Sequence, residues 1–359
     1  MSFASAPASV VGAQFDGSES VDAPTLQIQG WSNDVGGAQL RLSFPLWEGP
    51  LWGGNPLQAD KIKASGTVGV SIKTTEGIYT SFAPALDRAE VHLVSDKLGI
   101  RLGQGNVRWG AGRYATLILD SCAPPYPFVN VEAAADTRLG KASYRRLLGK
   151  LGPQPDTYLL GHRLELYPRQ WLRLGVSEIA IANSRFVGMP TNWIPLWPFY
   201  LTQHLAIRSG VPKINEDSNE NLGLDITAVL RPGTAVYGEF FVDDMPQRPE
   251  NPGVYQIGFL LGGTTELGPA SKLDAEYARV NNYTYTFREP ARSYLNEGRP
   301  LGFQFGPDTD RFILMLRRES KDLEIGAGIE LRRRGEGRIG DKWQDEGWKE
   351  ARKHSFLSG

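Results

Sequence analysis

A short run of glycine, tryptophan and arginine, WGAGR at Trp109 to Arg113, combines residue types that bind sugars. A tryptophan ring can stack on a sugar ring, and an arginine can donate hydrogen bonds to the sugar oxygens. Glycine lets the backbone approach closely or adopt a positive φ, and Tyr114 follows directly. The run predicts either a carbohydrate-binding loop or a tight loop fixed by a buried Trp109, and the sequence leaves both readings open.

Acidic residues are numerous, which raises the question of hydrolytic chemistry. A glycosidase needs two carboxyl groups at a defined separation, and a sequence does not supply that separation. Asp308 and Asp310 in FGPDTDR are most simply an Asx-type turn with Pro307, and the four histidines are scattered along the chain. We therefore expect no catalytic residue, no metal ion and no cofactor.

Composition narrows the class of protein. The chain has 359 residues with a formal charge of −1, 41 glycines, 9 tryptophans and 13 tyrosines. A nucleic-acid partner would need a concentrated basic surface, so the balanced charge argues against one. The single cysteine, Cys122, excludes an internal disulfide. Many glycines and aromatic residues are typical of a β-protein with many turns.

The candidate residues lie on segments that alternate apolar and polar side chains, most clearly between Asn221 and Arg334. Side chains on a strand alternate sides with period 2, so each segment predicts a strand with one apolar and one charged face. We expect Thr157 to Tyr167 and Trp171 to Ala182 to form a hairpin. Ala142 to Leu151 is the first predicted helix, and Met189 to Arg208 predicts a loop feeding a short helix that folds inward.

The apolar faces could pack on a second sheet or contact lipid. Several strands are long enough to cross a membrane at a tilt, and aromatic residues gather near strand ends, as at Tyr167 and Trp171. Full charges stand mid-strand on the polar faces. These observations favour a closed antiparallel transmembrane β-barrel of about sixteen to eighteen strands with short plugging helices. We expect its interior to hold a paired charge network made of Arg163, Glu239, Asp274, Glu276, Arg279, Glu324, Glu330 and Arg332.

Further residues could contact a polysaccharide at the strand ends. Asp243 and Asp244 end one strand and could bind sugar hydroxyls or Ca²⁺, or form a solvated pair. Glu178 shares the parity of the apolar residues of its strand, so either a bulge shifts the register or Glu178 lies at the membrane edge. Trp193 and Trp197 lie in a segment rich in tryptophan and proline. With Trp109, Arg113 and Tyr114, these residues form our predicted polysaccharide-binding set.

The two ends of the chain differ from its middle. Residues 1–24 are small, polar and aperiodic, so we expect a disordered or incomplete first element, with no visible signal peptide. Residues 335–359 are charged and lack alternation, which predicts a solvated tail. The predicted barrel therefore covers residues 25–334.

Ordered motifs resemble one family. The segment WGAGRYATLILDSCAPPYP, Trp109 to Pro127, is similar to the WGPG…LLLS…NAPP signature of the capsule assembly Wzi family. The paired strands YLLGHRLELYP and LRLGVSEIAI follow, then NENLGLDITAVLRPGTAVYGEFFVDD, EYARVNNYTYTF and PLGFQFGPDTDRF in the order of that family. The resemblance covers Leu98 to Arg334.

This resemblance implies a plugged outer-membrane β-barrel lectin that holds capsular or related polysaccharide at the cell surface, without catalysis. We accordingly expect an outer-membrane monomer whose partners are surface polysaccharide and lipid. Two alternatives stay open: a porin-like passive channel, and a soluble all-β carbohydrate-active enzyme.

Overall fold

The computed structural model describes residues 25–31, 37–49, 62–75, 81–211, 214, 217–244, 255–319 and 324–341. The chain forms two compact units, one from residues 1–106, 124–135 and 145–149, the other from 107–123, 136–144 and 150–359. Its regular structure is mostly β-strand, with two short α-helices in the described ranges. None of the helices in these ranges has the length and apolar character that crossing a membrane requires.

The first unit is an antiparallel sheet whose strands neighbour one another in chain order. Opposite charges pair inside it: Arg101 lies 2.9 Å from Glu90, and Arg145 lies 3.1 Å from Glu132. All four side chains are buried. Its strands are β1 (Thr25–Trp31), β2 (Gly37–Gly49), β3 (Ile62–Thr75), β4 (Ser81–Val94), β5 (Leu98–Gly105) and β6 (Tyr126–Thr137).

The second unit contains a longer antiparallel sheet, also in chain order. Its strands are β8 (Tyr158–Arg169), β9 (Leu172–Ala182), β10 (Ser218–Arg231), β11 (Thr234–Asp244), β12 (Gln256–Gly268), β13 (Ser271–Val280), β16 (Thr309–Glu319) and β17 (Glu324–Arg334). Between them lie α1 (Ser184–Val187), the 3₁₀ turn η1 (Pro190–Trp193), α2 (Phe199–Arg208), the 3₁₀ turn η3 (Pro290–Arg292) and the two-residue strands β14 (Leu295–Asn296) and β15 (Arg299–Pro300).

Strand β7 (Gly140–Lys150) corrects the predicted helix at Ala142 to Leu151. Its buried side chains Ser143, Arg145 and Leu147 alternate with partly exposed ones, which is the period of a strand. Short basic segments carry weak helical preference, and pairing within a sheet overrides it. Strand β16 pairs with β13 and β17.

The second sheet has two contrasting faces, which we call the polar face and the apolar face. On β10, Asn221 and Asp225 are buried, whereas Leu222, Leu224 and Ile226 are exposed. The same contrast holds on neighbouring strands. Exposed apolar-face residues include Leu164, Val176, Val236, Phe240, Phe259, Leu261, Phe312, Leu314 and Leu316. A soluble sheet buries its apolar side, so this arrangement is reversed.

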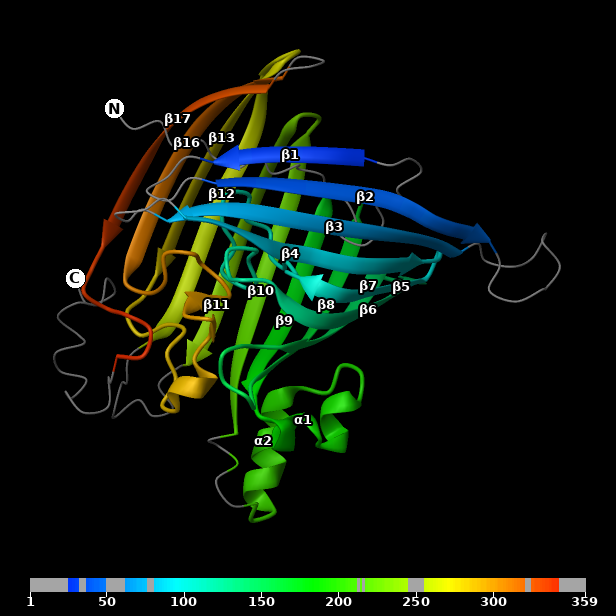
Figure 1. Ribbon diagram of the computed structural model, residues 1–359, viewed down its shortest axis with the longest axis vertical. Helices are drawn as coiled ribbons and strands as arrows, with labels where there is room; N and C mark the ends of the chain where they lie inside the picture. The colour runs from blue at the N-terminus through cyan, green and yellow to red at the C-terminus, as the bar shows by residue number, and fades with distance from the viewer. Residues whose placement is uncertain are drawn as a thin grey trace. The chain divides into compact units, whose positions relative to one another are not determined.

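The two ends of this sheet also differ. Short turns join β8 to β9, β10 to β11 and β12 to β13 at one end. The long connections 183–217, 245–255 and 281–308 all join strands at the other end, which we call the loop end. Figure 1 shows α1 and α2 beyond the loop ends of β9 and β10.

The structure describes only a part of the two chain ends for which predictions were made. Residues 1–24 and 342–359 lie outside the described residues. In the tail, Gly335 donates its backbone N–H to the carbonyl of Asp308 at 2.7 Å. Gly337 donates to the Asp308 carboxylate at 3.2 Å. The first part of the predicted tail is therefore tied to the connection that precedes β16.

Candidate functional site

The segment Val107 to Ala123, which contains WGAGR, is a folded loop that we call the central loop. Trp109 and Leu119 exchange backbone hydrogen bonds of 3.0 and 3.1 Å, which close the loop on itself. Trp109 is 2% exposed, and Leu117, Ile118 and Leu119 are fully buried. Because its apolar side chains are packed away, the loop presents mainly backbone N–H and C=O groups to its neighbours.

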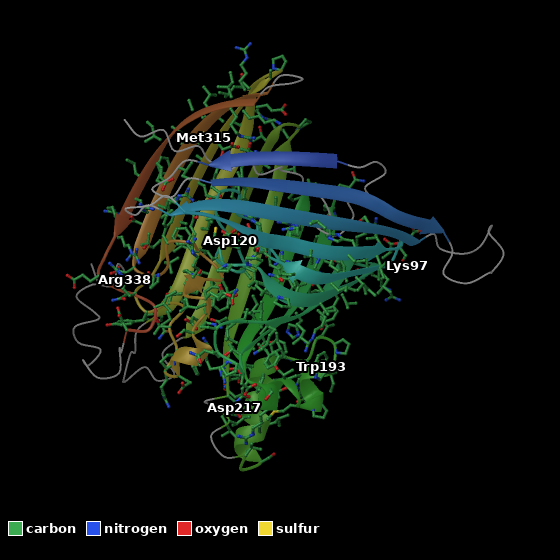
Figure 2. The ribbon with its side chains drawn as sticks, viewed as in Figure 1. Lys97, Asp120, Trp193, Asp217, Met315 and Arg338 are labelled. Carbon is green, nitrogen blue, oxygen red and sulfur yellow. The ribbon has the colours of Figure 1, made fainter. Side chains whose placement is uncertain are left out.

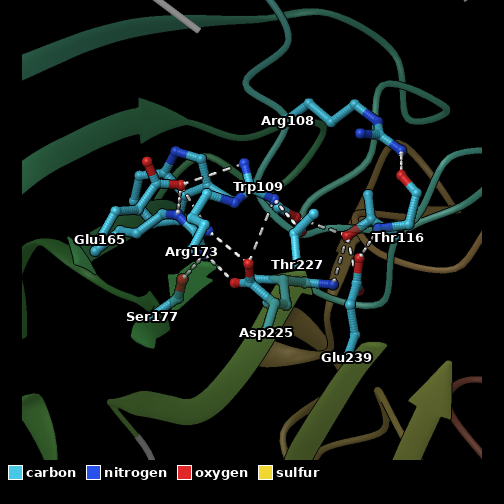
Figure 3. A network of polar contacts seen from close by, with 12 residues as sticks. Arg108, Trp109, Thr116, Glu165, Arg173, Ser177, Asp225, Thr227 and Glu239 are labelled. Atoms are coloured by element: carbon cyan, nitrogen blue, oxygen red, sulfur yellow. Dashed lines mark hydrogen bonds and ion pairs between the residues drawn. The ribbon is translucent and has the colours of Figure 1, made fainter. Parts of the chain in front are cut away.

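Glu239 on β11 is the main anchor of the central loop. Its carboxylate accepts the backbone N–H of Gly112 at 2.6 Å and that of Leu117 at 2.7 Å. The Thr116 hydroxyl lies 3.0 Å from the same carboxylate and 2.6 Å from the carbonyl of Trp109. Figure 3 shows Glu239 reaching from its strand toward Thr116. A buried carboxylate needs such donors, so loop and strand satisfy each other.

Two acids of β13 hold the next part of the loop. Glu276 accepts the backbone N–H of Arg113 at 2.6 Å and that of Tyr114 at 3.1 Å. Asp274 accepts the Tyr114 hydroxyl at 2.7 Å and pairs with Arg317 at 2.7 Å. Burial and the nearby Asp274 raise the pKa of Tyr114, so its hydroxyl stays a donor at neutral pH.

Two stacked tyrosines support the loop from the 281–308 connection. Tyr285 donates to the carbonyl of Leu117 at 2.8 Å, and Tyr294 donates to the carbonyl of Ile118 at 2.6 Å. Their ring centroids lie 5.3 Å apart with an interplanar angle of 15°. Burial raises the pKa of Tyr285 well above its usual value, which keeps this donor protonated. Two connections of the second unit therefore pack together as one body.

A second polar cluster surrounds Arg163 on β8. Its guanidinium contacts Glu165 at 2.7 Å, Asp225 at 2.6 Å and the Ser177 hydroxyl at 2.7 Å. Arg173 lies 3.7 Å from Asp225. Figure 3 shows Arg173 with these acids and Ser177. The buried guanidinium therefore has two carboxylates and a hydroxyl as partners, which makes the cluster a structural ion-pair network.

Comparison with known proteins gives the family. The model of the family described as "Capsule assembly protein Wzi" matches residues 79–351. The chain belongs to this family. The resemblance predicted from the motifs is therefore confirmed.

Two solved structures are similar to this chain, the first of them at the level of the fold. Wzi of Escherichia coli, described as a carbohydrate-binding β-barrel involved in group 1 capsule assembly, superposes with a TM-score of 0.58 at 18% identity, covering 87% of this chain and 69% of that one. OmpT of Vibrio cholerae, an outer-membrane protein, gives 0.46 at 10% identity, covering 87% and 89%.

One curated relative matches over a short stretch. A probable peptidoglycan glycosyltransferase, FtsW of Nitrosococcus halophilus (strain Nc4), is 38% identical over 81 residues. The match covers 23% of this chain, and this chain spans about a fifth (21%) of the length of that relative. A match this short supports no statement about the activity of a Wzi-family chain.

The predicted polysaccharide-binding residues do not form one site in this Wzi-family chain. Trp109 is buried, and the backbone N–H groups of Arg113 and Tyr114 are bonded to Glu276, so WGAGR adopts the tight-loop alternative. Asp243 accepts the N–H of Tyr285 at 2.5 Å. The side chain of Asp244 lies outside the described residues.

Trp193 differs from the rest of that set because half of its surface (50%) is exposed. It lies at the end of η1, and its indole N–H donates to the carbonyl of Val187 at 2.8 Å. Figure 2 shows it on the helical segment at the loop end. Trp197 is only partly exposed. Trp193 is thus the most exposed aromatic residue of the set.

Glu178 keeps its parity, because β9 pairs with β10 without a bulge. Its carboxylate accepts the backbone N–H groups of Phe199 at 2.8 Å and Tyr200 at 3.0 Å, and contacts His162 at 2.8 Å. A carboxylate at the N-terminus of a helix satisfies otherwise unpaired donors. Of the two predicted explanations, the bulge is excluded, and Glu178 also caps α2.

The predicted inward helix is also corrected by these contacts. Phe199 stacks on His162 with centroids 4.7 Å apart, and His162 has the parity of exposed Leu164 and the opposite parity to buried Arg163. Helix α2 therefore begins on the apolar face. Where we predicted a plugging helix, the polar face is instead contacted by the irregular central loop through Glu239 and Glu276.

The predicted charge network needs one correction. Arg279 pairs in register with Phe259 and Asp310, which places it on the apolar face, whereas Asp274 and Glu276 have the opposite parity. It contacts Asp308 at 3.4 Å. Arg279 stands five positions after Asp274 and three after Glu276, and on a strand an odd offset turns the side chain to the other face.

The remaining members of that network are distributed along the second unit. Glu330 pairs with Arg311 at 3.0 Å, and Arg332 lies over the Phe305 ring at 4.2 Å. The side chain of Glu324 is outside the described residues. The sequence analysis missed Asp225 and Arg311. The pattern that could have identified them is a charged residue within a strand, on the same side as the other polar residues of that strand. The described residues hold no cluster of three His, Cys, Asp or Glu placed for a metal ion.

Proposed function

We propose that this Wzi-family chain is an outer-membrane protein, with its apolar face in lipid and its strands closed into a barrel of about sixteen to eighteen strands. The observation that carries this is the reversed pattern of burial: Leu222, Leu224 and Ile226 are exposed, while Asp225 is buried on the same strand. In water such a surface would be an association hazard, and in lipid it is the favourable arrangement.

The chain binds capsular or related surface polysaccharide and helps to attach or assemble it at the cell surface. Membership of a capsule assembly family supports this, as does the fold shared with a carbohydrate-binding barrel. The role is binding without cleavage. A glycosidase needs one carboxyl group free to protonate the leaving oxygen, whereas Glu239 and Glu276 are occupied by backbone N–H groups of the central loop.

The loop end faces the outside of the cell. Outer-membrane barrels have short periplasmic turns and longer extracellular loops, and the long connections of the second unit all lie at one end. The polysaccharide contacts the surface of these connections, and Trp193 is the proposed stacking residue there. The protein acts as a monomer that contacts only lipid and polysaccharide.

A pair of matched tryptophans tests this proposal. Trp193 at the loop end is 50% exposed, and Trp171, in the turn between β8 and β9 at the other end, is 52% exposed. Refolded protein is titrated with fluorescently labelled capsular polysaccharide extracted from the producing cells. We expect Trp193→Ala to weaken binding about tenfold, which is about 1.4 kcal/mol and close to the value of one aromatic stacking contact, and Trp171→Ala to leave it unchanged.

Three results would contradict the proposal. Absence of polysaccharide binding by the unaltered protein removes the binding function. Steady large conductance in planar bilayers identifies a porin-like channel instead. Recovery in the soluble fraction, with no change of gel mobility on heating, removes the membrane barrel itself. Equal binding by the two tryptophan variants would remove only Trp193 from the site.

A further inference from the structure

Helix α2 carries an apolar surface that no described residue covers. Phe199, Thr202 and Ala206 form its buried side. The other side exposes Tyr200 (56%), Leu201 (39%) and Leu205 (45%), and Leu196 just before the helix is 58% exposed. We call these four residues the α2 apolar surface. Surface helices of soluble proteins present polar residues on the side away from the core, so this helix is patterned for contact with something apolar.

The start of α2 lies on the same side of the sheet as the exposed strand residues. His162, Glu178 and Leu222 face one another in register across β8, β9 and β10, and Leu222 is exposed on the apolar face. Phe199 stacks on His162, and the backbone N–H of Leu196 reaches the Tyr144 hydroxyl at 3.4 Å. The chain therefore passes over the apolar face before it enters the helix.

The start of α2 lies at the height of the first polar and charged residues on the apolar face. On β8 and β9, Leu164 and Val176 are exposed, and the next residues of the same parity toward the loop end are His162 and Glu178. These two are paired at 2.8 Å, and Glu178 also accepts two backbone N–H groups of α2. A charge in contact with hydrocarbon is costly, and the cost falls to near zero at the interface.

On a separate group of strands, the exposed apolar residues also give way to charged residues toward the loop end. On β13, β16 and β17, Asp310 pairs with Arg333, and Arg279 is their cross-strand neighbour on the apolar face. Toward the other end, the following apolar-face residues Phe312 and Leu314 are exposed and uncharged. Polar pairs therefore mark the edge of the apolar band at the loop end on both sets of strands.

We propose that the α2 apolar surface inserts into the headgroup and upper acyl region of the bilayer, so that α2 is an interfacial helix attached to the outside of the barrel wall. The occupant is lipid because the α2 apolar surface begins at the level where the exposed strand surface ends. Tyr200 supplies the amphipathic ring that such interfaces favour. Arg208, exposed at the end of the helix, can extend to lipid phosphates.

This inference rests on the proposed membrane barrel, and spin labels can test the two separately. In a Cys122→Ser background, cysteine is introduced singly at Tyr200, Leu205, Ile226 and Gln154 and labelled with a nitroxide. The protein is reconstituted in vesicles of phosphatidylcholine and phosphatidylglycerol. Ile226 is an exposed apolar-face residue of β10, and Gln154 is exposed in the loop between β7 and β8 at the loop end. They are the lipid and water references.

The measurement is the ratio of collision rates with oxygen, which concentrates in lipid, and with a water-soluble nickel chelate. We expect Tyr200 and Leu205 to give ratios close to that of Ile226 and several times that of Gln154. Ratios equal to that of Gln154 would overturn the lipid contact while the Ile226 label still reports a membrane barrel. Low rates with both reagents would show protein covering the helix, from a second copy or a partner, and also overturn it. A water-like Ile226 would overturn both proposals.

Discussion

The attachment of the central loop to β11 gives a quantitative prediction. Glu239 accepts two backbone N–H groups, from Gly112 at 2.6 Å and Leu117 at 2.7 Å. The hydroxyl of Thr116 has the carbonyl of Trp109 as a second partner at 2.6 Å. Replacing Glu239 by alanine therefore leaves two buried N–H donors without an acceptor, while Thr116 keeps one.

The expected loss follows from these two donors. Each buried donor left without a partner costs about 1–3 kcal/mol, so Glu239→Ala has a range of roughly 2–6 kcal/mol. Water entering the space left by the side chain can bond to one N–H, which brings the expected loss to about 3 kcal/mol. Glu239→Gln keeps one acceptor oxygen for one of the two donors, so we expect about half that loss.

The assay is urea unfolding of protein refolded in detergent micelles, followed by tryptophan emission and extrapolated linearly to zero denaturant. Glu266→Ala is the matched control, because Glu266 is exposed at the turn end of β12, and such surface changes stay within about 0.5 kcal/mol. Limited trypsin cleavage at Arg108 and Arg113 provides a second readout, since a loosened loop opens more often.

One result would refute this reasoning. The free energies of unfolding of Glu239→Ala and Glu266→Ala could differ by less than about 0.5 kcal/mol, and trypsin could cut the two proteins equally. In that case the central loop is held by its own packing. The carboxylate would then be incidental to the position of the loop. A Glu239→Gln variant less stable than Glu239→Ala would also contradict the donor count.

Two further predictions concern buried packing in the second unit. Arg163→Met leaves Glu165 and Asp225 without their nearest cation, with only Arg173 at 4.0 and 3.7 Å. The same titration should therefore show a loss of about 3 kcal/mol; an unchanged midpoint would contradict a paired network. Gly112→Ala places a methyl group against the carbonyl of Ala115 and the side chain of Glu239, whereas Gly268→Ala meets open space. We expect a loss of about 1–3 kcal/mol for the first and a change within about 0.5 kcal/mol for the second, and equal effects would contradict the close contact.

Alternation in the sequence predicted the strands well where one face is apolar and the other charged. The β8–β9 hairpin was predicted closely. Alternation failed at β7, where Arg145 and Leu147 share the buried face, because a polar face that packs against other protein accepts both residue types. On such a strand the burial of the side chains alternates from one residue to the next, but their hydropathy does not.

The candidate site was harder to predict because its contacts join residues that are far apart in the sequence. Glu239 and Gly112 are 127 residues apart, and no local pattern links a strand carboxylate to a loop N–H. WGAGR was identified as special, and both of its readings fit the residue types. Only the burial of Trp109 separates them. Glu178 was identified as anomalous from its parity alone, but its partner is the backbone of α2, which has no residue-type signature.

The charges of the polar face bear directly on whether such a barrel conducts. An open pore leaves its lining carboxylates to water and ions, whereas Glu239 and Glu276 each accept two backbone N–H groups from the central loop. Arg163 is enclosed between Glu165 and Asp225 in the same way. In a barrel closed as we propose, these acids anchor protein within the wall and are not available to select solutes. Glu239 and Glu276 therefore mark attachment points of the central loop, whereas the same alternating pattern in a porin would indicate a water-filled lining.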